Sequence, residues 1–207
     1  MKNRIDTKYF IPEGLNENSV VIEGGGYVGE WALWLHNTHK CNLHVFEPSP
    51  DNYKQIVDLF GMKEKVVLMQ RALWDTDGLE TIYLLDGKPN GNSLYDRSKC
   101  GQKLCGEELV MTTRLDTYMN NYGIDRVDLL KLNVEGAEVQ ILMSLDWDMA
   151  RRIKNITYST HEGKIIGVED CVRIRTHLQS IGYEVERYTD PKWDFKNRWK
   201  ATHKETP

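Results

Sequence analysis

The sequence lacks a long hydrophobic run. No apolar stretch among its 207 residues approaches the roughly 18 that a membrane-spanning helix requires, so we expect no transmembrane segment. The first 18 residues also lack the apolar centre of a signal peptide, and export is not expected either. Together these absences predict a cytoplasmic protein that has no membrane partner.

Cysteine is scarce, and basic residues are not in surplus. The four cysteines, at positions 41, 100, 105 and 171, are expected to be reduced thiols in that compartment. Cys100 and Cys105 have no second pair of cysteines or histidines to complete a zinc site, and we assign no metal ligand. The formal net charge of −4 differs from the basic surplus that is typical of nucleic-acid-binding proteins.

What the sequence does contain is an alternation of short apolar runs and amphipathic stretches, which is typical of α/β proteins. Strands are expected at 19–23, 43–46, 65–68, 80–85, 109–113, 127–132, 153–159 and, as the last one, 183–188. Helices are expected at 27–36, 51–60, 115–122, from about 137 to 145, and at 168–181. No repeat or linker divides the chain, so we expect one domain over 1–207, with an N-terminal lead (1–18) and a C-terminal tail (189–207).

Residues 20–29 read Val-Val-Ile-Glu-Gly-Gly-Gly-Tyr-Val-Gly, an apolar strand that ends at an acid and a glycine-rich turn. Two cofactor patterns match this stretch. The first, G-x-G-x-x-G, begins at Gly24 and is typical of dinucleotide-binding loops. The second, E-x-G-x-x-x-G, runs through Glu23, Gly25 and Gly29 and is the loop pattern of S-adenosylmethionine (SAM) enzymes. Glu23 would repel a pyrophosphate but suits the ammonium and sulfonium groups of SAM, so it favours SAM.

Candidate site residues lie at the carboxyl ends of five predicted strands, where ligands bind in doubly wound sheets. They are Glu23, Glu47, Arg71–Leu73, Asn133–Glu135 and His161–Glu162. Glu47 ends the second strand, where a carboxylate can accept hydrogen bonds from both ribose hydroxyls of an adenosine cofactor. The alternative for Glu47 is a solvated acid at a strand end.

Two of these positions are candidates for proton transfer. His161 could accept a proton from a substrate hydroxyl, because the usual pKa of histidine lies near neutrality; a structural role and metal ligation are the alternatives. Glu135 is the second candidate. It lies three residues before Glu138 at an expected helix start, where both acids could simply favour the helix dipole. Asn133 is expected to make a polar contact at the cofactor end of the sheet.

The stretch 86–106 is rich in Gly, Asn, Ser and Lys and is expected to form a long loop. Loops of this length in a compact domain are usually functional or disordered. This one could close over an acceptor and exclude water. Its candidate contacts are Asn90, Asn92, Ser93 and Tyr95.

The segment 191–200 interleaves basic and aromatic residues. Such a surface can stack on sugar rings or on bases. A tail that folds onto the sheet edge is the alternative, and in an acidic chain we do not expect nucleic-acid binding.

Four segments together resemble the FkbM-type family of SAM-dependent methyltransferases. They are the loop 23–29, Val-Phe-Glu-Pro-Ser-Pro at 45–50, Arg-Leu-Asp-Thr at 114–117 and Leu-Lys-Leu-Asn-Val-Glu-Gly-Ala-Glu at 130–138. The likeness extends from about residue 19 to 188. Family members usually have a D-x-G-A-N-x-G type loop, and they have Asp where this chain has Asn133. The amide removes a carboxylate that could have a metal-binding or acidic role.

The resemblance implies an α/β, Rossmann-like class I SAM-dependent methyltransferase fold, with a central, mostly parallel sheet and helices on both faces. It also implies O-methylation of a hydroxyl on a sugar or glycosylated small molecule, with His161 as the first candidate base and Glu135 as the second. The cofactor-binding candidates are Glu23, Gly25, Tyr27, Gly29, Glu47, Pro48, Arg71, Ala72 and Asn133. The acceptor-binding candidates are Asn92, Ser93, Tyr95 and Glu162.

Two other functions use the same architecture. An NAD-dependent oxidoreductase or epimerase would need a Tyr-x-x-x-Lys pair or an equivalent, and the acid at Glu23 counts against it. A non-catalytic SAM-binding module would keep the cofactor pocket without the chemistry, and Asn133 is compatible with that function. The sequence identifies neither the acceptor nor the oligomeric state.

Overall fold

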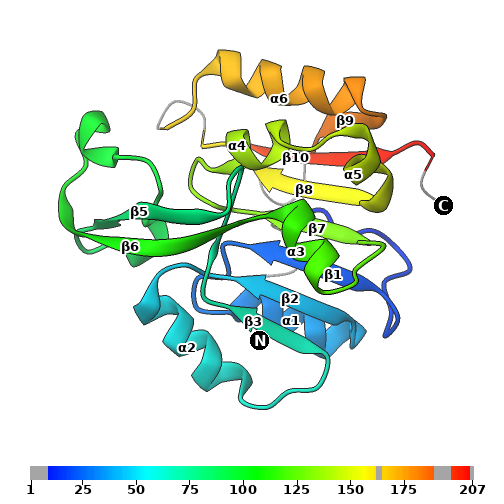
Figure 1. Ribbon diagram of the computed structural model, residues 1–207, viewed down its shortest axis with the longest axis horizontal. Helices are drawn as coiled ribbons and strands as arrows, with labels where there is room; N and C mark the ends of the chain where they lie inside the picture. Colours follow the sequence, from blue (N-terminus) through cyan, green and yellow to red (C-terminus); the bar gives the residue numbers. More distant parts are fainter. Residues whose placement is uncertain (1–8, 162–164, 189–196, 206–207) are drawn as a thin grey trace.

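The computed structural model describes residues 9–161, 165–188 and 197–205. Within them, a central sheet contains β1 (Val20–Gly24), β2 (Asn42–Phe46), β3 (Val66–Met69), β7 (Leu129–Leu132), β8 (Asn155–Ser159), β9 (Tyr183–Arg187) and β10 (Arg198–His203). Their spatial order is β3-β2-β1-β7-β8-β10-β9 (Figure 1). Paired strands are parallel except at β10, which runs antiparallel to both of its neighbours.

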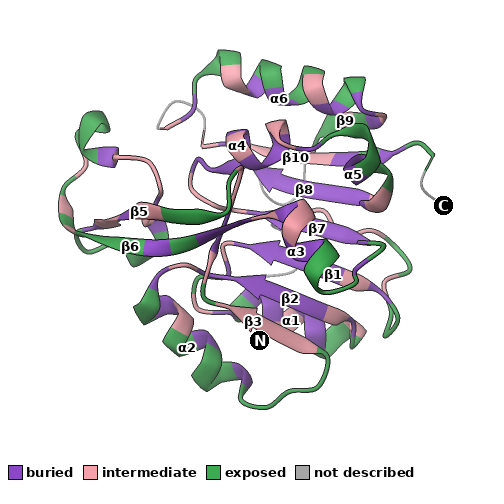
Figure 2. Ribbon diagram, viewed as in Figure 1, coloured by how far each residue is buried: buried purple, intermediate pink, exposed green. Residues whose placement is uncertain are grey.

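The middle strands β2, β1, β7 and β8 are buried almost throughout (Figure 2). Parallel strands that are covered on both faces are expected to be apolar along their whole length. Successive side chains alternate between the faces, so Val21 belongs to one core and Ile22 to the other. Two charged residues, Glu23 and Lys131, interrupt this apolar pattern and are nevertheless buried.

Helices cover both faces of the sheet. They are α1 (Glu30–His39), α2 (Pro50–Phe60), α3 (Leu115–Asn121), α4 (Glu138–Met143), α5 (Trp147–Arg152) and α6 (Val168–Ser180). Apolar side chains of α1 and α2 pack into one core, and those of α3, α4, α5 and α6 pack into the other. Because these strands run parallel, their carboxyl ends meet at one edge of the sheet, and the site lies there.

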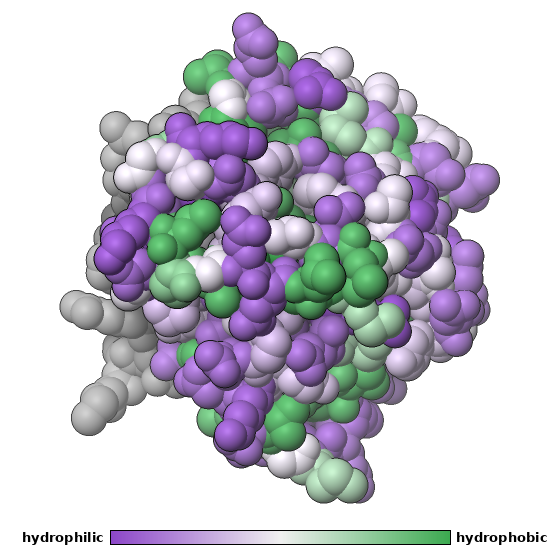
Figure 3. All heavy atoms as spheres, turned by 60° about the vertical axis from the view of Figure 1, so that its left-hand side comes forward, coloured by the Kyte–Doolittle hydropathy of each residue, from purple (hydrophilic) through white to green (hydrophobic). Residues whose placement is uncertain are grey.

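A smaller sheet projects from the side of the central one (Figure 1). It contains β4 (Ala72–Trp74), β5 (Gly78–Leu85) and β6 (Leu104–Arg114), in the order β4-β6-β5. Between β5 and β6 lie two short 3-10 turns, η1 (Pro89–Gly91) and η2 (Arg97–Cys100). Figure 3 brings this side forward and shows a mostly hydrophilic face with separate hydrophobic patches. Leu79 and Met111, which are cross-strand partners here, are both exposed.

Most predicted elements are confirmed, but several boundaries were wrong. The first helix begins at Glu30 and not at residue 27, because Tyr27 and Gly29 both have a positive φ. The helix predicted to reach residue 145 ends at Met143, and a further helix that was not predicted, α5, follows, capped by the Asp146 side chain, which accepts from the Met149 N–H. The loop expected at 86–106 ends earlier, because β6 begins at Leu104.

The strand 183–188 was predicted to be the last, and this is wrong. Residues 198–203 of the expected tail form β10, which inserts between β8 and β9. In the described part of the chain, no helix combines the length and the apolar character needed to cross a membrane.

Candidate active site

A cavity opens beside the carboxyl ends of β1, β2 and β7. Its empty space, including the open mouth, is about 570 Å³, a size typical of small-molecule sites. The turns after these strands line it together with the start of β4 and the segment 89–94. Its lining includes seven predicted cofactor-binding residues: Gly25, Tyr27, Glu47, Pro48, Arg71, Ala72 and Asn133. It also includes Asn90, Asn92, Ser93 and Glu135.

Glycine is required at position 25 by the close approach of two turns. Gly25 has a φ of +80°, and a Cβ there would collide with the carbonyl oxygen of Asn133. The N–H groups of Gly25 and Gly26 both donate to the carbonyl of Phe46 at 3.0 Å. The loop after β1 is therefore held against both neighbouring strands, with bare backbone at the cavity.

The other two loop residues predicted to bind the cofactor differ in position. Tyr27 lines the cavity and is 37% exposed, and its φ of 50° is unusual for a residue with a side chain. Gly29 is not among the described lining residues; its φ of 82° caps α1, and a Cβ there would meet Leu59 and Phe60. Gly29 thus begins the helix and packs it against α2.

Glu47 presents a buried carboxylate at the cavity. Its Oε2 accepts a hydrogen bond from the Tyr27 N–H at 2.8 Å, and its Oε1 accepts from the Ser49 N–H at 3.0 Å and the Asn52 amide at 3.4 Å. Burial raises the pKa of Glu47 to about 7, although these three donors favour the charged form. The group is poised to accept further donors.

Glu23, in contrast, does not belong to the described cavity lining. Its Oε1 is 2.7 Å from the Nζ of Lys131, and the two side chains are 1% and 4% exposed. Burial raises the pKa of Glu23, and the charge of Lys131 acts in the opposite direction. The predicted direct contact between Glu23 and a cationic cofactor is thus replaced by an ion pair within the protein.

Glu135 lies at the centre of a chain of charges. Its Oε2 accepts from Arg97 Nη1 at 3.0 Å, and its Oε1 lies 2.9 Å from His161 Nε2. Its backbone has a positive φ of 53°, and its carbonyl accepts a hydrogen bond from the Ser93 hydroxyl at 2.7 Å. Because Ser93 and Arg97 both come from the segment between β5 and β6, they tie that segment to the turn after β7.

His161 faces two carboxylates. Its Nε2 bonds to Glu135, and its Nδ1 lies 3.5 Å from Glu138 Oε1, an ion-pair distance without good hydrogen-bond geometry. Burial lowers the pKa of His161, but the two glutamates outweigh this effect and raise it to about 9. The ring is therefore protonated at neutral pH. A protonated ring counts against His161 as the general base and favours Glu135, the second candidate.

Glu138 stabilises the start of a helix, which was the simpler of the two roles considered for it. It is fully buried, and its carboxylate accepts hydrogen bonds from the N–H groups of Val134 at 2.9 Å and Gly136 at 2.8 Å. These bonds satisfy backbone donors ahead of α4, as an acid at a helix start is expected to do.

The family model described as "Methyltransferase FkbM domain" matches residues 23–185, which is most of the chain. The chain belongs to this family.

Known relatives of this FkbM chain agree with that assignment. It is 23% identical over 202 residues to methyltransferase sdnD of Sordaria araneosa, a match that covers 84% of this chain and 76% of that protein. It is 26% identical over 191 residues to methyltransferase 1 of Beauveria bassiana, covering 82% and 74%. The FkbM methyltransferase of Methylobacillus flagellatus superposes with a TM-score of 0.61 at 11% identity, over 91% of this chain and 44% of that one.

The predicted fold is confirmed as that of the class I SAM-dependent methyltransferases. SAM is accordingly the methyl donor of this FkbM chain. The cavity fits such a cofactor, because the buried Glu47 carboxylate can accept hydroxyl donors beside the bare backbone of Gly25. Among the described residues, no group of three or more His, Cys, Asp or Glu side chains is arranged to hold a metal ion.

The structure of this FkbM chain brings only some of the predicted acceptor-binding residues to the cavity. Asn92 and Ser93 line the cavity, and both already bond to the protein: the Asn92 side chain accepts from the Leu85 N–H at 3.0 Å. Tyr95 instead lines a neighbouring hollow beside α4 and α6, where its hydroxyl bonds to Gln140. Glu162 lies outside the described residues.

Tyr95 and Lys99 have the Tyr-x-x-x-Lys spacing of the oxidoreductase alternative. Their geometry differs from that of a catalytic pair, because the Lys99 side chain is 80% exposed and pairs with Asp96 at 3.6 Å. Membership of the FkbM family likewise identifies the chain as a methyltransferase and not as an NAD enzyme.

Part of the aromatic and basic segment 191–200 forms a strand of the central sheet. Residues 191–196 lie outside the described part, but Arg198, Trp199 and Lys200 belong to β10. The Trp199 ring stacks on Tyr158 at a centroid distance of 6.4 Å, and its Nε1 donates to the Thr160 hydroxyl at 3.2 Å. Trp199 therefore packs within the fold.

Two buried charged residues were missed as parts of the site. The burial of Lys131 could have been predicted from the sequence, because this lysine lies within the apolar run Leu-Leu-Lys-Leu. A buried lysine needs a buried partner, and Glu23 in the first strand is one. Arg97 had no comparable signal, since it lies among other polar residues in the loop. Its side chain is nevertheless 5% exposed and bonds to Glu135 and to the Gly91 carbonyl.

Proposed function

We propose that the chain acts as one cytoplasmic methyltransferase domain that methylates a hydroxyl oxygen of a sugar or glycosylated small molecule. Membership of the FkbM family supports the methyl transfer. The observation that carries the proposal further is the position of Glu135, a carboxylate that lines the cavity from the turn that follows β7. Hydroxyl acceptors need such a group because they must lose a proton as the methyl group is transferred.

Glu47 and the glycine loop would hold the cofactor. Glu47 would accept hydrogen bonds from the ribose hydroxyls, while Gly25 and Tyr27 would lie along the rest of the donor. Phe46, Leu73 and Val134 contribute apolar surface to the cavity. Bound SAM supplies a methyl group on a positively charged sulfur, which needs no further activation by the protein.

The chain's own task is then to position the acceptor and take its proton. Holding two reactants in line supplies much of the acceleration in such a transfer. We assign the proton to Glu135, because this carboxylate lines the cavity, whereas His161, 2.9 Å from it, is not among the described lining residues and is protonated. His161 would orient this carboxylate, and the segment 89–94 would exclude water from the reacting groups.

The test measures S-adenosylhomocysteine release with a panel of glycosides that differ in hydroxyl stereochemistry. At least one glycoside should support turnover by the native chain. Glu135→Gln should lower kcat about 100-fold while SAM still binds, and His161→Gln should lower it less, about tenfold. The matched control is Glu169→Gln, an exposed acid in the first turn of α6, which should keep native turnover. Native turnover by Glu135→Gln would contradict the assignment, and SAM binding without turnover on any acceptor would favour the non-catalytic module.

A further inference from the structure

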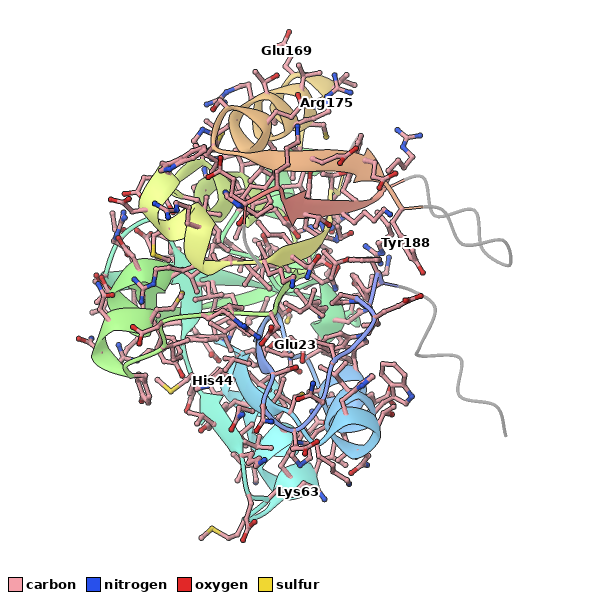
Figure 4. All side chains as sticks on the ribbon, turned by 90° about the vertical axis from the view of Figure 1, so that its right-hand side faces the viewer. Glu23, His44, Lys63, Glu169, Arg175 and Tyr188 are labelled. Carbon is pink, nitrogen blue, oxygen red and sulfur yellow. The ribbon has the colours of Figure 1, made fainter. Side chains whose placement is uncertain are left out.

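Glu23 and Lys131 are placed opposite one another by the sheet itself. They are register partners in the parallel pairing of β1 with β7. Figure 4 shows Glu23 in the interior of the molecule, whereas Lys63 and Glu169 lie at opposite ends. Two charges this deeply buried in the middle of a sheet are rare unless they are paired.

Lys131 reaches beyond its ion pair to the cofactor loop. Its Nζ donates to Glu23 Oε1 at 2.7 Å and to the carbonyl oxygen of Gly25 at 3.2 Å. The rings of Tyr9 and Trp31 lie 5.0 and 5.4 Å from the same nitrogen. The ammonium group is thus confined by two oxygens and two aromatic faces.

The Gly25 carbonyl belongs to the part of the loop that meets the cavity. The neighbouring N–H groups are fixed by the Phe46 carbonyl, and Lys131 fixes the carbonyl of the same residue. Without Lys131, the peptide that joins Gly25 to Gly26 would keep the bond from its N–H to the Phe46 carbonyl but lose the bond to its carbonyl oxygen. The loop would then have more than one shape available at the cavity.

Stability alone is a weak explanation for this pair. Apolar residues of similar volume often replace a buried ion pair without loss, whereas removing one partner leaves a costly unpaired charge. We propose that Lys131 is a positioning residue, which holds the cofactor loop through the Gly25 carbonyl and uses Glu23 as its counter-ion. This inference rests on the proposed function in one respect, which is that the cavity binds SAM.

The test separates positioning from stability with three variants, Lys131→Met, Glu23→Gln and the double variant. Urea unfolding measures stability, and calorimetry with S-adenosylhomocysteine measures affinity. Lys131→Met should be destabilised, because it buries Glu23 without a partner, and the double variant should recover part of that stability, because it buries no unpaired charge. The double variant should still bind about tenfold more weakly than the native chain, because the Gly25 carbonyl remains free.

Glu23→Gln should also be destabilised, because Lys131 loses its counter-ion, but it keeps Lys131 on the Gly25 carbonyl and should bind within about threefold of the native chain. A loss of about tenfold in this variant would overturn the proposal and favour direct contact between Glu23 and the cofactor. Native affinity in the double variant would also overturn it, since the pair would then serve stability alone. The matched control removes the partly exposed pair of Lys200 and Glu186, which are 2.7 Å apart on β10 and β9, and should leave affinity unchanged. Failure of the native chain to bind would instead contradict the proposed function.

Discussion

Glu47 carries a carboxyl group whose charge changes near neutral pH. Burial raises its pKa from 4.5 to about 7, so the folded chain holds this proton more tightly than the unfolded chain does. The contribution of the protonated Glu47 side chain to the free energy of unfolding is therefore greatest below pH 4.5. It falls by up to ~3 kcal/mol as the pH rises through about 7.

This titration predicts how cofactor affinity depends on pH. If the ionised carboxylate accepts the ribose hydroxyls, affinity for S-adenosylhomocysteine should rise roughly tenfold between pH 6 and pH 8 and then level off. Glu47→Gln should bind more weakly at every pH, lose this dependence and unfold at a higher urea concentration at pH 8. Calorimetry and urea titrations at matched pH values measure both effects. The control Asp58→Asn changes an exposed acid on α2 and should keep the native profile; a flat profile in the native chain would rule out this role for Glu47.

Among elements, the segment 89–97, which we call the strap, joins the small sheet to the active site. It is tied at several points: Asn52 donates to the Pro89 carbonyl at 3.3 Å, Ser93 donates to the Glu135 carbonyl, and Arg97 pairs with the Glu135 carboxylate. Because five residues of the strap line the cavity (Pro89, Asn90, Asn92, Ser93 and Leu94), the strap must stay in place for the cavity to stay closed on that side.

Breaking one of these ties should speed cofactor release. Arg97→Met removes the guanidinium and leaves Glu135 with His161 alone, so we expect S-adenosylhomocysteine to dissociate about tenfold faster. Stopped-flow displacement measures this rate. Lys99→Met alters an exposed side chain on the same 3-10 turn and should release the product at the native rate. Equal rates for the two variants would show that the strap does not limit release.

Over the whole molecule, the alternating pattern predicted the parallel strands, and the motifs at Glu23, Glu47 and Asn133 carried the resemblance to the family, because both are local signals. The strand β10 escaped prediction because it reads Arg-Trp-Lys-Ala-Thr-His, and burial of Ala201 and His203 follows from their position between two other strands. The roles of Arg97 and His161 depend on contacts with Glu135, 38 and 26 positions away along the chain (135 − 97 and 161 − 135). No local pattern encodes such contacts.

We expect the cavity at the carboxyl ends of β1, β2 and β7 to bind the methyl donor. Calorimetry of the native chain at pH 7.5 with SAM, S-adenosylhomocysteine and NAD measures this binding. The first two should bind at one site per chain, with dissociation constants of about 1 to 100 μM, and NAD should not bind. Binding of NAD in place of SAM, or of none of the three, would contradict the account.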